Sequence, residues 1–199
     1  MKLTMKKAVT HLRKSDPIMA AIIERVGACR MTYREATFEA LARAIVFQQL
    51  STKAASTIYG RFSEAAGGAV TPEAINNLSV GEMRRAGLSK QKISYIRDLA
   101  GHAISGSLDL RRTESMSDEE VIVMLTSIKG IGLWTAHMFL IFALRRPNIL
   151  ATGDLGVQTA IKKAYRKRKM PTPKDIEKIA KAWHPYCSVA CWYLWRSLE

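Results

Sequence analysis

Residues 125–140 read LTSIKGIGLWTAHMFL, and this stretch decides the fold that we expect. An apolar segment ends at Ile128, the turn Lys129-Gly130-Ile131-Gly132 follows, and a second apolar segment begins at once. Two glycines separated by one residue let the backbone take positive φ, so one helix can end and another begin with almost no loop. The stretch therefore predicts a helix-hairpin-helix.

The predicted turn also has a chemical consequence. Backbone N–H groups at the start of the second helix would point outward, with the positive end of the helix dipole behind them, and such groups bind anions. An isolated glycine pair is equally well explained as a simple helix break. Other features of the sequence are needed to distinguish an anion-binding turn from a simple helix break.

The charge balance favours a nucleic acid as the anion. The 199 residues include 31 Lys and Arg against 17 Asp and Glu, a formal net charge of +14. A surface of this kind attracts polyanions, and binding through phosphates weakens steeply with salt. A ribosomal or simply soluble basic protein would have the same composition, and the basic run 165–169 is also typical of a solvated helix face.

The cysteines and the N-terminus indicate an intracellular protein. Three cysteines, Cys29, Cys187 and Cys191, are too few and too scattered for a disulfide framework. The first residues lack the apolar core of a secretory signal, and no stretch is long enough to cross a bilayer. We expect a cytoplasmic protein in a bacterium, associated with the nucleoid, or a nuclear one in a eukaryote, with no membrane contact.

The remaining pattern predicts an all-α fold. Apolar residues recur at helical spacing, as in Ile18, Ile22 and Val26, and the pairs Ser79 with Glu82 and Ser117 with Glu120 have capping-box spacing. No apolar run of period two bounded by turn signals stands out. The acids 118–120 are therefore better explained as helix-start charges than as a catalytic pair.

Four segments in order resemble motifs of the helix-hairpin-helix DNA glycosylase superfamily. Residues 130–136 match a GIGxWTA signature, 48–51 resemble the end of an IxGQQxS motif, and 153–158 read GDLGVQ. The ending 183–196, WHPYCSVACWYLWR, resembles the last helix of the DNA-3-methyladenine glycosylase II group. The resemblance covers roughly residues 38–195.

This resemblance implies one glycosylase domain, 1–199, built as two helical lobes around the hairpin with a DNA-binding cleft between them. One lobe would comprise roughly residues 1–36 plus 147–199, and the other roughly 37–146. The implied partner is damaged double-stranded DNA, bound by a monomer. The extra N-terminal β domain of some relatives is absent from the matched region.

Asp154 is the catalytic carboxylate that the resemblance implies. From the residues alone, an Asp after Gly and before a helical pattern is equally well explained as an N-cap. The two roles are compatible. A glycosylase passes through a cation-like sugar, and a fixed anion near the anomeric carbon stabilises that charge.

The implied reaction is hydrolysis of the N-glycosidic bond of alkylated purines, of the 3-methyladenine and 7-methylguanine type. Trp134 stands where bifunctional relatives have a lysine that forms a Schiff base, so the resemblance implies a monofunctional enzyme. The four-cysteine iron–sulfur loop of the endonuclease III branch is missing, and Cys187 and Cys191 are expected to be core residues. We expect no required cofactor.

The other implied site residues fall into three sets. Contacts with DNA are assigned to Gln48, Gln49, Leu50, Gly130, Gly132, Trp134 and Thr135, with Gln49 and Leu50 as a wedge that fills the gap left by a flipped base. The base pocket is assigned to Trp134, Met138 and Trp195. A monovalent cation, Na⁺ or K⁺, is assigned to the backbone carbonyls of Thr126, Ile128 and Ile131.

Three departures from the family pattern, Phe47, Met138 and Cys187, leave the loop geometry and the pocket selectivity open. Two other functions also remain open. One is a structure-selective DNA-binding module that has lost catalysis, and the other is a glycosylase for a different lesion, such as uracil or hypoxanthine.

Overall fold

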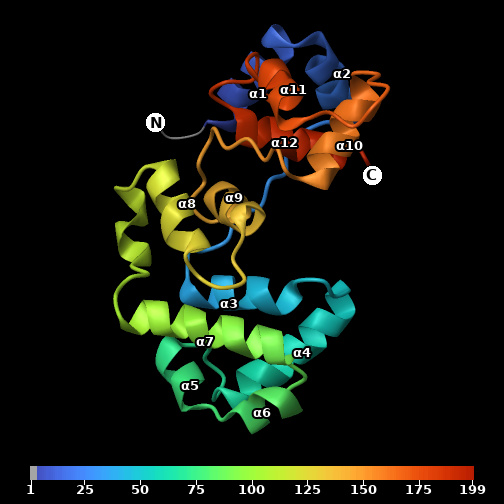
Figure 1. Ribbon diagram of the computed structural model, residues 1–199. Helices are drawn as coiled ribbons and strands as arrows, with labels where there is room; N and C mark the ends of the chain where they lie inside the picture. Colours follow the sequence, from blue (N-terminus) through green and yellow to red (C-terminus); the bar gives the residue numbers. More distant parts are fainter. Residues whose placement is uncertain (1–3) are drawn as a thin grey trace. The chain divides into compact units, whose positions relative to one another are not determined.

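The computed structural model describes residues 4–199, and helices are the only regular structure in that range (Figure 1). The predicted all-α class is therefore confirmed for the described residues. The α-helices are α1 Met5–Ser15, α2 Pro17–Val26, α3 Phe38–Phe47, α4 Thr52–Ala65, α5 Pro72–Asn77, α6 Val80–Arg85, α7 Lys90–Ile104, α8 Asp118–Thr126, α9 Leu133–Phe142, α10 Leu155–Ala164, α11 Pro173–Ala180 and α12 Cys187–Arg196. A short 3₁₀ helix, η1, spans Leu110–Glu114. Within these residues no helix has the length and apolarity that a membrane span needs.

The contacts divide the chain into two compact units. The first unit joins residues 4–33 to His137–Glu199, and the second is Arg34–Ala136. The second crossing between the units thus falls near the middle of α9, between Ala136 and His137, whereas the sequence predicts divisions near residues 36 and 146.

The second unit is built on α7. This helix buries Ile93, Ile96 and Leu99, and helices α3, α5 and α6 pack against it (Figure 1). The predicted capping boxes of Ser79 with Glu82 and of Ser117 with Glu120 are both formed, at the starts of α6 and α8. Each satisfies N–H groups that the first helical turn leaves without an acceptor.

The first unit is organised around α12, which contacts α1, α2 and α10. Residues 187–194 of α12 are all buried. Asp16 connects distant parts of this unit: one carboxylate oxygen caps α2, and the other accepts hydrogen bonds from the Tyr165 hydroxyl and the Trp183 indole. Such bonds to a buried carboxylate fix how these segments pack.

Candidate functional site

The predicted hairpin is present and turns tightly. Helix α8 ends at Thr126, α9 begins at Leu133, and the turn between them is closed by a 3.1 Å bond from Ile131 N–H to the Ile128 carbonyl. The first hydrogen bond of the second helix runs from Ala136 N–H to the Gly132 carbonyl (3.0 Å). The N-terminus of α9 therefore opens at the glycine turn, where an anion would bind.

Only one of the two glycines is needed for its backbone angle. Gly130 has φ +82, and a Cβ there would lie 2.1 Å from Cδ2 of Tyr95. Gly132 has no positive φ, and a Cβ on it would meet nothing within 4 Å. The expectation that both glycines supply positive φ is therefore wrong for Gly132, whose missing side chain instead leaves the helix start uncovered.

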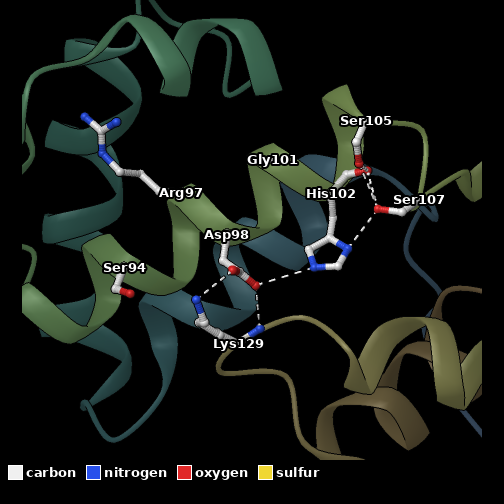
Figure 2. A pocket seen from close by; sticks show the side chains of 8 residues that line it. All are labelled: Ser94, Arg97, Asp98, Gly101, His102, Ser105, Ser107 and Lys129. Atoms are coloured by element: carbon white, nitrogen blue, oxygen red, sulfur yellow. Dashed lines mark hydrogen bonds and ion pairs between the residues drawn. The ribbon is translucent and has the colours of Figure 1, made fainter.

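The turn is fastened to α7 by Asp98 (Figure 2). One carboxylate oxygen accepts the backbone N–H of Lys129 (2.8 Å), and the other lies 3.2 Å from the Lys129 ammonium. His102, one turn along α7, places its Nε2 3.6 Å from the same carboxylate. The Lys129 N–H is the main reason that the pKa of Asp98 is lowered.

The loop after α3 is a turn in which Gln49 and Leu50 are exposed. Gln49 has φ +57, a left-handed conformation that few residues other than glycine adopt. Leu50 is 39% exposed, and Ser51 caps α4 by accepting the Ala54 N–H (3.3 Å). Gln48 differs from its neighbours, because its side-chain amide donates to the Gly130 carbonyl (2.8 Å).

The predicted contact residues on α9 differ in exposure. Trp134, in the first turn of the helix, is 53% exposed, whereas Thr135 is buried. Met138 lies one turn further along and is half-buried. An indole that is largely exposed in the free protein offers apolar area to a ligand.

In the first unit, Asp154 is buried and caps α10. Its Oδ1 accepts the Val157 N–H (2.8 Å) and also the indole N–H of Trp195 (2.8 Å). The N-cap interpretation is thus correct as geometry, and the Trp195 bond is an additional feature that capping does not require. Two donors on one oxygen hold the carboxylate in a single orientation.

Gly156 makes the contact between Trp195 and Asp154 possible. A Cβ at this position would lie 2.9 Å from Cδ1 of Trp195 and 3.0 Å from Oδ1 of Asp154. The Phe142 ring also packs near this indole, with its centroid 5.8 Å from that of Trp195. The carboxylate is therefore positioned by an aromatic cluster and by a residue too small to displace it.

The C-terminal tryptophans separate clearly. Trp183 and Trp192 are buried in the core, and Trp195 is only half-buried. Cys187 and Cys191 are fully buried, as expected. Burial raises the pKa of each thiol to about 12, so both stay protonated at neutral pH.

Comparison with known proteins agrees with this geometry. Residues 42–185 match the model of the HhH-GPD superfamily of base excision DNA repair proteins. The chain belongs to this superfamily.

Several similar proteins have about the same length as this chain. DNA-3-methyladenine glycosylase 1 of Schizosaccharomyces pombe is 34% identical over 200 residues, which cover 98% of this chain and 88% of the relative. A DNA-3-methyladenine glycosidase from Bacillus halodurans has a similar crystal structure, with a TM-score of 0.87 and 42% identity over 94% of this chain and 87% of that one. A second similar structure is that of the S. pombe 3-methyladenine DNA glycosylase in complex with abasic DNA. Its TM-score is 0.82 and its sequence identity is 36%, over 95% of each chain.

Two site residues of this HhH-GPD protein were missed from the sequence. Asp98 and Lys92 lie on α7, 31 and 44 residues from their hairpin and loop partners. Neither belongs to a motif, and each acts on backbone atoms of a remote segment. Among the described residues no group of three or more His, Cys, Asp and Glu is placed to hold a metal ion.

Proposed function

We propose that this protein is a monofunctional DNA glycosylase that hydrolyses the N-glycosidic bond of alkylated purines in duplex DNA, as a step of base excision repair. The observation that carries the proposal is the buried Asp154 carboxylate, held by the Val157 and Trp195 N–H groups. The relatives named above, which are a DNA-3-methyladenine glycosylase and a DNA-3-methyladenine glycosidase, support the substrate class.

Asp154 acts on the sugar. As the bond from C1′ to the base breaks, the electron pair leaves with the base, which loses the positive charge that alkylation gave it, and C1′ becomes cation-like. The fixed carboxylate stabilises that charge. Water then bonds to C1′ and gives up a proton to the carboxylate or to solvent. A base that is already cationic leaves without an acid, so one carboxylate is sufficient.

The two compact units would be the two lobes of one glycosylase domain. The N–H groups of Gly130, Gly132, Trp134 and Thr135 would bind phosphate, and Gln49 and Leu50 would fill the space of the extruded base. The base itself would be recognised by Trp134, Met138 and Trp195. Trp134 carries no amine, so no Schiff base would form and the strand would stay intact.

The hairpin carbonyls suit a monovalent cation. Thr126 is the last residue of α8, so its carbonyl is among those that no N–H of the helix can reach. With the carbonyls of Ile128 and Ile131 it gives a set of hard oxygen donors, which Na⁺ and K⁺ prefer over nitrogen or sulfur. The ion would link hairpin to phosphate and take no part in the chemistry. We further propose that the protein acts as a monomer, in the cytoplasm of a bacterium or in the nucleus of a eukaryote.

A panel of defined duplexes tests the proposal. Each duplex carries one of 3-methyladenine, 7-methylguanine, hypoxanthine, uracil or ethenoadenine, and free base is measured with chelator present. We expect release of the two methylated purines, with no strand cleavage and no trapping by borohydride. Release of uracil or hypoxanthine alone would indicate a different lesion, and duplex binding without any release would indicate a DNA-binding module.

A further inference from the structure

Lys92 forms two hydrogen bonds to the backbone at the end of α3, where the loop at residues 48–51 begins. It is half-buried on α7, and its ammonium donates to the carbonyls of Val46 (2.6 Å) and Gln48 (2.8 Å). These carbonyls lie at the C-terminal end of α3, where the last residues of a helix have no helical N–H to accept. A cation at this end also complements the helix dipole. Desolvation lowers the pKa of Lys92, in keeping with an ammonium withdrawn from water.

The bonds of Lys92 set the start of the loop at residues 48–51. The next residue, Gln49, has φ +57, and a side chain in that region raises the energy of the backbone. The surrounding structure must therefore hold the loop. Gln48 is held at both ends, since Lys92 binds its carbonyl and its own amide binds the Gly130 carbonyl.

The same side of α7 holds the hairpin turn at residues 128–132. Lys92, Tyr95 and Asp98 follow one another at intervals of three, so they lie along one side of the helix. The Tyr95 ring occupies the space that a side chain at Gly130 would need, and Asp98 accepts the Lys129 N–H. Loop 48–51 and turn 128–132 are thus fastened to one helix and to each other.

We propose that Lys92 is a positioning residue of the glycosylase reaction, one that fixes the loop 48–51 relative to the hairpin turn and binds no phosphate itself. This inference rests on the proposed function, which gives the loop its role as a wedge. The ordinary interpretation of a lysine beside such a loop, in a protein of charge +14, is a phosphate ligand. Two bonds from one ammonium to backbone carbonyls favour the positioning role.

The test compares Lys92→Met with Lys90→Met. Methionine matches the length of lysine without its donors, and Lys90 is an exposed lysine in the first turn of the same helix, so both variants lose one charge. Three quantities are measured: amide hydrogen exchange of residues 45–51 in the free protein, single-turnover release of 7-methylguanine, and the salt dependence of binding to undamaged duplex.

We expect Lys92→Met to raise exchange in the loop about tenfold and to slow base release about 10- to 100-fold, since small misplacements have effects of this size. The slope of log affinity for undamaged duplex against log salt concentration should be the same for Lys92→Met and Lys90→Met. In Lys90→Met, amide exchange of the loop and the rate of base release should match the wild type. Lys92→Arg keeps donors in reach and should restore most of the release rate.

Two results would overturn the inference. One is loop exchange in Lys92→Met equal to that in Lys90→Met. The other is a salt slope lower by about 0.9 than in Lys90→Met, the value of one lost phosphate contact. If Lys92→Met does not fold, Lys92→Gln, which keeps a shorter donor, is measured by the same criteria. A wild-type protein that releases no base refutes the proposed function instead, and the exchange comparison still decides whether Lys92 orders the loop.

Discussion

The orientation of the Asp154 carboxylate depends on the absence of a Cβ atom at Gly156. The indole of Trp195 reaches Oδ1 only because residue 156 has no side chain. Gly156→Ala would place a methyl group against both partners, whereas Gly153→Ala meets nothing within 4 Å and needs no positive φ. We expect Gly156→Ala to slow single-turnover base release about 10- to 100-fold. The release rate of Gly153→Ala should stay close to that of the wild type. Equal release rates for the two variants would contradict this role of residue 156.

Asp98 gives a pH dependence of known sign. Its pKa in the folded protein is lowered, chiefly by the Lys129 N–H, below the ordinary value of 3.8. Its contribution to stability is therefore fully present above about pH 3.8 and is lost as the pH falls through the folded pKa. Denaturant unfolding should show Asp98→Asn less stable than the wild type at pH 7, and the difference should shrink below pH 3.8. A difference that is constant with pH would mean that the charge plays no part.

The hairpin shows what a sequence pattern specifies at the scale of an element. The GxG pattern predicts the turn correctly but treats its glycines alike, although only Gly130 has a positive φ. Asp98 and Gln48 form hydrogen bonds with the backbone of the turn. These bonds could not be predicted from the sequence, because the partners are 31 and 82 residues away. Local signals such as the capping boxes were predicted correctly, since they depend on residues three apart.

Substitution of the two hairpin glycines separates folding from binding. Gly130→Ala combines a positive φ with a clash against Tyr95, so it should lower the free energy of unfolding by about 2 kcal/mol or more. Gly132→Ala meets no atom, so its stability should change by less than about 1 kcal/mol. The new methyl should instead weaken DNA binding by covering the start of α9. Equal losses of stability in chemical denaturation would show that our distinction between the glycines is wrong.

At the scale of the whole molecule, the spacing of apolar residues predicted the helical class, and the charge balance predicts affinity for polyanions. The contacts place the second crossing between the units within the continuous helix α9, where no turn residue marks it in the sequence. The net charge of +14 implies that phosphate contacts dominate non-specific binding. Affinity for undamaged duplex should fall at least about 100-fold between roughly 50 and 200 mM salt. If the affinity for undamaged duplex did not change with salt, binding through phosphate contacts would be contradicted.

The most direct test of the central claim is single-turnover release of 7-methylguanine by Asp154→Asn. Asparagine caps helices as well as aspartate does, and its oxygen can still accept from Val157 and Trp195, so the variant should fold normally. We predict that release falls at least about 100-fold, a loss typical of removing electrostatic transition-state stabilisation, while binding to undamaged duplex stays within about threefold. Release by Asp154→Asn within about threefold of the wild type would contradict the account.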